Sequence, residues 1–203
     1  MSKLLVIKSS PSGPASVSNQ LVDEIVARHR ALDPATVVVE RDLDLNPPPH
    51  LTSLNVDGVR AQAVTEVQLE TRETSDRLIA ELLDADTVVI GAPMHNFSIP
   101  TTLRAWFDHV LRPQVTFGYS AAGPAGLVTG KKAILALARG GPYMDGVSDH
   151  QESYLRGLLA FIGVTDVETI RAGRTAMGPD ARAASIAEAQ AAIAGLVDQR
   201  VAA

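Results

Sequence analysis

The stretch Leu4-Leu5-Val6-Ile7-Lys8, near the start of the chain, decides the fold. Its apolar residues follow one another without polar alternation, which is typical of a strand buried on both faces of a parallel sheet. Residues 87–92 and 133–138 have the same continuous apolar character, and residues 37–40 and 164–170 predict two weaker strands. The sequence therefore predicts five strands, spaced far enough apart for helices to lie between them.

Helical patterns fill these intervals. Apolar residues recur three or four positions apart within residues 21–32, 69–83, 103–110, 154–162 and 180–201. Ser18, just before the first pattern, is predicted to be its N-cap. The alternation predicts an α/β fold in which a doubly wound five-stranded parallel sheet has helices on both faces, as one domain spanning residues 1–203. The residues of the second helix that are expected to face the core are Leu69, Leu78, Ile79, Leu82 and Leu83.

Two segments depart from this alternation. Residues 46–65 include Pro47-Pro48-Pro49, which can extend neither a helix nor a strand, so we interpret them as an irregular insertion. Residues 114–131 contain four glycines and a proline, a composition that predicts a loop or a hairpin before the fourth strand.

The composition excludes several classes of function. The 203 residues carry a formal net charge of −5, so no basic surface is available for nucleic acid. There is no cysteine, which excludes disulfides and thiolate nucleophiles and suits the reducing cytoplasm. No apolar run is long enough for a signal peptide or a membrane span, so we expect a cytoplasmic protein without a membrane partner. The five histidines show no ligand spacing, so we expect no metal site.

The loop after the first strand, residues 9–19, holds five serines and no charged residue. Hydroxyls and free backbone N–H groups at the start of a helix form a site for a phosphate dianion. The loop lacks the lysine of a P-loop and the glycines of a dinucleotide fingerprint, so it is suited to a terminal monophosphate such as that of FMN. The alternative is a flexible Ser/Pro loop with an ordinary helix cap.

The loops after the third and fourth strands can border a flat ring. In residues 91–100, Asn96 and backbone amides can bond the polar rim of a flavin while Met94 and Phe97 border its face. In Arg139-Gly140-Gly141 the glycines allow close approach of the backbone, and the arginine places a positive charge near the ring. The alternatives are that Met94 and Phe97 cap the core and that the arginine lies on the surface of a tight turn.

Several motifs of the sequence resemble those of one known family. They are Lys8-Ser9-Ser10, Ser16-Val17-Ser18-Asn19, Pro93-Met94-His95-Asn96-Phe97 and Arg139-Gly140-Gly141, together with residues 123–132 and 161–166. In order along almost the whole chain, they resemble the FMN-dependent NADH-azoreductases, also called NADH:quinone oxidoreductases.

The resemblance implies a flavodoxin-like fold and a homodimer with one FMN in each subunit and each active site at the dimer interface. It implies a ping-pong cycle in which NADH or NADPH delivers hydride to N5 of FMN and leaves, after which a quinone or azo compound takes two electrons. Tyr119 and Phe161 stand where the family places aromatic residues around the substrate. The implied FMN contacts are Ser10, Ser16, Val17, Ser18, Met94, His95, Asn96, Phe97, Ala138, Arg139, Gly140 and Gly141.

Two positions depart from the family pattern. His95 replaces a familiar tyrosine, and Ala138 replaces a serine that often precedes Arg-Gly-Gly. A backbone N–H can serve FMN at both positions, so binding is still expected, whereas substrate preference and flavin potential are open. His95 is also the candidate proton donor to a reduced quinone or azo nitrogen, the alternative being that it only packs or hydrogen-bonds locally.

Two other functions remain as alternatives. A flavodoxin-type carrier would share the fold and FMN but would pass single electrons to protein partners. A non-catalytic FMN-binding protein would bind flavin without accepting electrons from NADH.

Overall fold

The computed structural model describes residues 2–120, 123–143 and 149–201, with side chains as far as residue 196. Within these residues, five parallel strands form one sheet in the order β2-β1-β3-β6-β7, as predicted. The strands are β1 (Lys3–Lys8), β2 (Val37–Asp42), β3 (Thr87–Pro93), β6 (Lys132–Ala138) and β7 (Asp166–Ala172). The chain goes from β1 to β2 on one side and then crosses to β3 on the other, so the switch point lies between β1 and β3.

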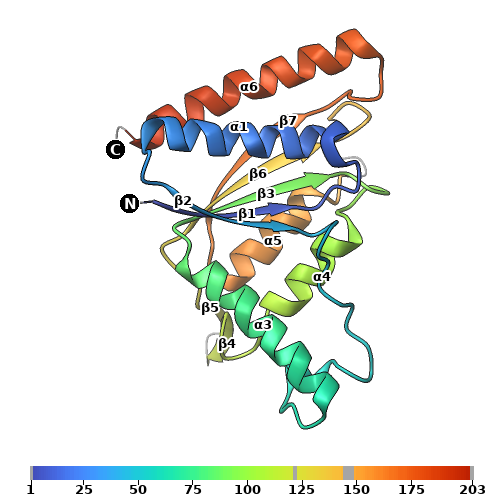
Figure 1. Ribbon diagram of the computed structural model, residues 1–203, viewed down its shortest axis with the longest axis vertical. Coiled ribbons are helices and arrows are strands. Elements are labelled where there is room, and N and C mark those ends of the chain that lie inside the picture. The colour runs from blue at the N-terminus through green and yellow to red at the C-terminus, as the bar shows by residue number, and fades with distance from the viewer. Residues whose placement is uncertain (1, 121–122, 144–148, 202–203) are drawn as a thin grey trace.

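Helices cover both faces of this sheet (Figure 1). One face carries α1 (Val17–Leu32) and α6 (Pro179–Val201), and the other carries α3 (Glu66–Asp84), α4 (Thr101–Val110) and α5 (Glu152–Ile162). β1 illustrates why both faces need cover, because Leu4 and Val6 pack under α1 while Leu5 and Ile7 pack under α3 and α4. The continuous apolar runs of the sequence therefore correspond to strands with a core on each side.

Gly91 in β3 sets how closely α1 approaches the sheet. A Cβ at this position would lie 2.7 Å from Cγ2 of Val22 and 3.3 Å from the carbonyl oxygen of Ser18. A side chain here would push the first turns of α1 away from the sheet, so this glycine helps to place the start of α1 beside the ends of β1 and β3.

The ends of several elements differ from prediction. The fifth strand begins at Asp166, because Gly163 ends α5 in the left-handed region with φ 104° and Val164 still donates to the carbonyl of Leu159. The predicted core face of α3 was partly wrong, since Leu69 and Leu83 are 49% and 43% exposed. The first half of α3 instead buries small or polar side chains against its neighbours, where Thr71 lies close to Gly58 and Ser75 donates to the carbonyl of His109 at 2.7 Å.

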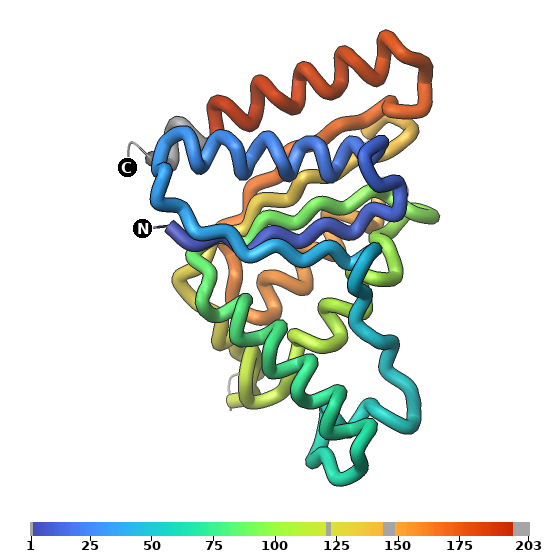
Figure 2. Tube along the Cα trace, in the orientation of Figure 1, coloured from blue at the N-terminus to red at the C-terminus, as the bar shows by residue number. Residues whose placement is uncertain are grey.

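Residues 46–65, called the excursion below, leave the sheet after β2 and return beside α3 (Figure 2). They contain one helical turn, α2 (Asp57–Arg60), that the sequence analysis did not predict. Residues 114–131 contain the predicted hairpin, in which β4 (Phe117–Ser120) pairs antiparallel with β5 (Gly123–Gly126). Among the described residues, no helix is both long enough and apolar enough to cross a bilayer.

Candidate active site

The loops that follow β1, β3 and β6 meet around one hollow of about 190 Å³ at the carboxyl ends of the strands. We call these three loops, residues 9–16, 93–100 and 139–143, the site loops. Open α/β sheets bind ligands at this position, next to the switch point. The hollow is lined by Ser10, Ser12, Ala15, Ser16, Val17, Ser18, Pro93, Met94, His95, Ala138, Arg139, Gly140, Thr175 and Arg182.

The first site loop brings hydroxyl groups to the start of α1. Ser16, and not Ser18 as predicted, is the N-cap: its Oγ accepts from the backbone N of Asn19 at 3.1 Å. The short 3-10 helix η1 (Gly13–Ala15) advances the helix start by two residues, so Ser18 lies in the first turn, fully buried, with its Oγ 3.2 Å from that of Ser16. Ser10 lies across the hollow with only 3% of its surface exposed. The start of α1 thus has the donors and the dipole orientation that suit a phosphate.

The second site loop ends in a strained turn. His95 and Ser98 exchange two backbone hydrogen bonds of 2.9 Å, and the two residues between them, Asn96 and Phe97, have φ of 47° and 68°. Two successive positive φ values make a turn of type I′, which asparagine tolerates and phenylalanine disfavours. Phe97 is nevertheless 60% exposed at the tip. A large aromatic side chain held outward at a backbone cost of roughly 1–3 kcal/mol points to a functional contact.

The third site loop is held against the chain that follows β7. The carbonyl of Arg139 accepts from the backbone N of Thr175 at 3.1 Å and from its hydroxyl at 2.9 Å, and the carbonyl of Gly140 accepts from Ala176 at 3.1 Å. A Cβ on Gly141 would meet nothing within 4 Å, and one on Gly140 would meet only the methyl group of Ala176 at 3.1 Å. The backbone here therefore presents an open surface that a flat ring can approach.

The side chain of Arg139 is engaged within the protein. The side chain is 7% exposed, with Nη2 2.7 Å from the Asp149 carboxylate and Cζ 4.1 Å from the centre of the Tyr143 ring. Burial raises the pKa of the Tyr143 phenol, so this group stays protonated at neutral pH. Asp149 therefore offsets much of the arginine's charge, and a positive charge of Arg139 near a flavin ring stays a prediction.

Residues 149–151 link the second and third site loops, and we call them the brace. Besides the contact of Asp149 with Arg139, the backbone N of His150 donates to the carbonyl of Phe97 at 3.0 Å. Nε2 of Gln151, which is fully buried, donates to the carbonyl of Ala92 at 2.9 Å. No sequence motif marks these three residues, and the contacts of His150 and Gln151 join residues more than 50 positions apart.

The two predicted substrate-pocket residues lie elsewhere. Tyr119 is in the β4–β5 hairpin, 69% exposed, and Phe161 is near the end of α5; both contact Phe117, at ring-centre distances of 5.8 Å and 4.6 Å. Helix α5 starts at the brace and is 11 residues long, so its two ends are about 16 Å apart. Figure 1 accordingly shows the hairpin on the side where the strands begin, away from the site loops. The structure does not bring these residues to the hollow of the same chain.

The hollow also contains residues that the sequence analysis missed. Thr175 follows β7, so the rule that ligands bind beyond the carboxyl ends of strands could have identified it. Arg182 comes from the first turns of α6, where no sequence motif marks it. In the described part of the chain, no three His, Asp or Glu side chains gather where they could hold a metal ion.

The hollow fits the phosphate end of FMN better than the whole molecule. Buried serine hydroxyls and a helix start supply the donors a phosphate requires, and Gly140 and Gly141 leave room beside the backbone for a ring. Its volume of about 190 Å³ is nevertheless below the roughly 300–1,000 Å³ of ordinary cofactor pockets. The hollow itself is therefore too small for a flavin ring, and the placement of a ring beside Met94–Phe97 stays a prediction.

Comparison with known proteins agrees with this geometry. Residues 2–197 match the family model described as "Flavodoxin-like fold". The chain is 52% identical over 197 residues to an FMN-dependent NADH:quinone oxidoreductase of Hyphomonas neptunium, covering 96% of this chain and 95% of that protein. It is 47% identical over 201 residues to a protein of the same name from Azospirillum brasilense, with 96% and 97% covered. Among solved structures it resembles an azoreductase from Bacillus anthracis, with a TM-score of 0.88, 28% identity, and 98% of this chain and all of the other covered.

Proposed function

Because the chain belongs to the flavodoxin-like fold family and, within it, to the FMN-dependent NADH:quinone oxidoreductases, we propose that it uses NADH to reduce quinones and azo compounds through bound FMN. The observation that carries this proposal is the meeting of three predicted loops around one hollow in a chain that shares about half its residues with a protein of that activity. When bound, FMN supplies the hydride chemistry, and the protein supplies binding, orientation and exclusion of water.

We assign the phosphate to the start of α1. Ser16 and Ser18 offer hydroxyls, the first backbone N–H groups of the helix point toward the hollow, and Ser10 closes the other side. The ring then extends toward the second and third site loops, where Met94, Asn96 and Phe97 border it and Gly140 and Gly141 approach its rim. Val17, His95, Ala138 and Arg139 complete the proposed set of contacts.

We further propose that donor and acceptor use one approach to the ring in turn, in a ping-pong cycle. Backbone of the second and third site loops borders the ring, which leaves its open side for both partners. His95 lines the hollow with an exposed imidazole, and an imidazole can pass a proton near neutral pH to a reduced quinone oxygen or azo nitrogen. The structure supports this role by placement only, since His95 has a free path to solvent.

A homodimer would complete the site. Phe97 and Tyr119 expose 60% and 69% of their surfaces, and aromatic residues this exposed are characteristic of interfaces. Tyr119 and Phe161 lie too far from the hollow of their own chain to cover its ring, but the same residues of a second copy can do so. We therefore propose that each substrate pocket is shared between two copies of this single-domain chain.

The proposed location is the cytoplasm. The absence of cysteine is compatible with a reducing compartment, and the proposed donor NADH is present in the cytoplasm. The net charge of −5 also argues against nucleic acid as a partner.

The test is anaerobic mixing of the FMN-loaded protein with NADH, and separately with NADPH, while the absorbance of oxidised flavin is followed. We expect rapid bleaching that a quinone or an azo dye reverses. Bound flavin that neither nucleotide bleaches would instead indicate an electron carrier or a non-catalytic flavin-binding protein. Light scattering on the same sample should give the mass of two chains, and a single-chain mass would contradict the shared pocket.

A further inference from the structure

The site loop that surrounds the proposed phosphate position brings no positive charge of its own. Residues 9–19 contain no lysine, arginine or histidine. A phosphate monoester carries close to two negative charges at neutral pH, so neutral hydroxyls and N–H groups alone leave much of that charge uncompensated. An unpaired cation near the loop would compensate the rest of the phosphate charge.

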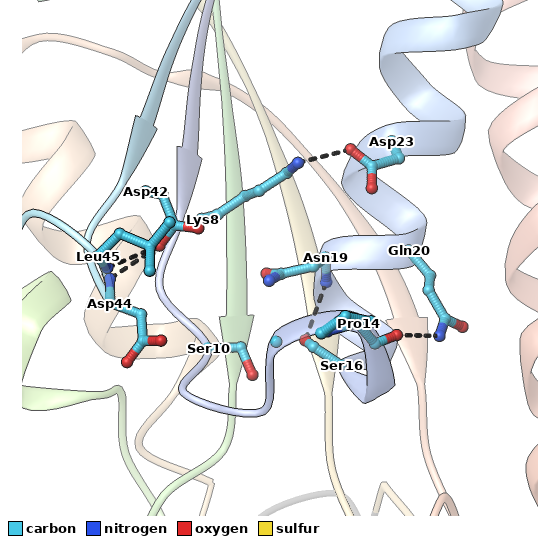
Figure 3. Close-up of a pocket in the computed structure, with 11 residues that line it drawn as sticks. Lys8, Ser10, Pro14, Ser16, Asn19, Gln20, Asp23, Asp42, Asp44 and Leu45 are labelled. Carbon is cyan, nitrogen blue, oxygen red and sulfur yellow. Dashed lines mark hydrogen bonds and ion pairs between the residues drawn. The ribbon is translucent and has the colours of Figure 1, made fainter.

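Lys8, at the end of β1, is not available for this purpose. Its Nζ lies 2.7 Å from the carboxylate of Asp23 and 3.1 Å from that of Glu40, and its side chain is 13% exposed. Figure 3 shows the ammonium directed at Asp23, away from Ser10 and Ser16. Two carboxylates therefore compensate this charge on the flank of the loop that faces β2.

Arg139 lines the hollow but is also paired, since Nη2 lies 2.7 Å from Asp149 and the guanidinium packs on Tyr143. Arg182 is the other arginine among the lining residues. One of its nitrogens, Nη2, donates to the carbonyl of Ala15 at 2.9 Å, and no carboxylate in the described part of the chain pairs with it. The charge of Arg182 is thus uncompensated, and its bond partner Ala15 directly precedes the N-cap Ser16.

The fold holds Arg182 at this place. Helix α6 packs along α1 on the same face of the sheet, and Figure 1 shows both helices starting above the carboxyl ends of the strands. The backbone N of Arg182 donates to the carbonyl of Gly178 at 3.0 Å, so the residue belongs to the first turn that α6 closes. A guanidinium has five N–H donors, and the bond to Ala15 uses one of them.

We propose that Arg182 binds the terminal phosphate of the flavin and gives the site its preference for FMN over riboflavin. Its guanidinium bonds the carbonyl of Ala15 and lines the same hollow as Ser10 and Ser18, so a phosphate in this hollow would lie between an arginine and a helix start. A charge-assisted bond of this kind is stronger than one between neutral groups. This assignment rests on the proposed function, because it requires FMN as the ligand.

The test compares two ligands that differ only in the phosphate. Flavin-free protein is titrated with FMN and with riboflavin, and the quenching of flavin fluorescence gives each Kd. We expect Arg182→Gln to weaken FMN binding about ten- to a hundredfold and to leave riboflavin binding within about twofold. Arg182→Lys should restore part of the difference, and added KCl should weaken FMN binding less in Arg182→Gln than in the unaltered protein.

Arg174→Gln is the matched control. Arg174 lies on the neighbouring loop, pairs with Glu188 at 3.4 Å and does not line the hollow, so its loss removes the same charge without altering FMN affinity. Equal weakening of FMN and riboflavin by Arg182→Gln, with a lower melting temperature, would overturn the proposal and leave the bond to Ala15 as a structural contact. Unchanged FMN affinity would also overturn it while leaving the oxidoreductase function intact, whereas an unaltered protein that binds no flavin would contradict both.

Discussion

The site loops and the excursion differ in whether their buried polar side-chain atoms have hydrogen-bond partners. Within the excursion, the Asn55 side chain accepts from the backbone N of Thr52 at 2.6 Å and donates to the carbonyl of His50 at 3.1 Å, and Arg72 of the neighbouring helix α3 donates to the carbonyls of Gly58 and Ala61. None of the buried, unpartnered side-chain atoms in the described chain belongs to residues 46–65. In the site loops and the brace, by contrast, Nε of Arg139, Oη of Tyr143 and Oε1 of Gln151 are buried without a hydrogen-bond partner.

The difference separates polar groups that hold the fold from polar groups kept for function. A buried donor or acceptor without a partner costs about 1–3 kcal/mol, so a chain tolerates several of them together only where something else is gained. The excursion is irregular in sequence but has no buried side-chain atom without a partner. The site loops lie in a regular part of the fold and yet contain buried polar atoms without partners, and Trp106, His109 and Arg112 in and just after α4 contain such atoms as well.

The largest expected effect comes from breaking the buried ion pair of the brace. In Asp149→Asn, Arg139 remains buried without its counter-charge, and we expect stability to fall by about 3 kcal/mol and FMN affinity to fall with it. Asp76→Asn is the matched change near the excursion, where Arg112 is 9% exposed but Asp76 is 53% exposed. Solvent screens that pair, so its loss should cost under about 1 kcal/mol. Urea unfolding of both variants measures the difference, and equal losses would contradict the contrast.

A smaller effect should separate the two helix caps. Ser16 caps α1 in the site, and Thr65 caps α3 at the end of the excursion, where Gln68 completes a capping box. Replacing either by alanine should cost about 1 kcal/mol of stability. Only Ser16→Ala should also weaken FMN binding, by about tenfold, because its hydroxyl is assigned to the phosphate as well. Loss of FMN affinity in Thr65→Ala would show that cap stability alone governs binding.

The smallest effect is a pH dependence of stability that arises where α4 contacts the excursion. His109 on α4 is fully buried, with Nε2 2.9 Å from the carbonyl oxygen of Pro49, and burial lowers the pKa of its imidazole. Below pH 6.5, the imidazole pKa in the unfolded chain, the unfolded chain binds a proton while the folded protein still holds this imidazole neutral. The stability that the neutral imidazole contributes is therefore fully present above pH 6.5. It is lost as the pH falls through the lower pKa of the folded protein. Urea midpoints at pH 7.5 and 5.5 should differ less in His109→Gln than in the unaltered protein. An unchanged difference would assign the pH dependence to other groups.

The local sequence was sufficient to predict the structural features that depend on the hydrophobic pattern alone. The strands at residues 4–8, 87–92 and 133–138 are continuous in hydrophobicity because both faces are covered, and the loops that follow them contain the site. The register of the first helix was missed because Ser16 and Ser18 both qualify as caps, and only the 3-10 turn before them decides between the two. Local pattern was least informative about Leu69, whose exposure depends on how the excursion packs against α3.

The remainder of the site could not be predicted, because it is built from contacts between distant segments. Gln151 reaches Ala92 across 59 positions, and Arg182 reaches Ala15 across 167. Neither residue carries a motif, and helical periodicity alone gives no reason to expect a side chain of α6 at the start of α1. Arg139 was predicted at the site from its sequence, yet the identity of its partner, Asp149, follows only from the position at which α5 begins.

The two edges of the sheet have a consequence for how copies of the chain can associate. The outermost strands, β2 and β7, carry Glu40, Arg41 and Asp42 on one edge and Asp166, Glu168 and Arg171 on the other. Charged residues along a free edge discourage another strand from adding to it, whether from a second native copy or from an aggregating chain. Continuation of the sheet from one molecule to the next is therefore disfavoured at both ends. Self-association is directed instead to the loops and helices, so the surfaces that resist fibril growth also favour a discrete assembly.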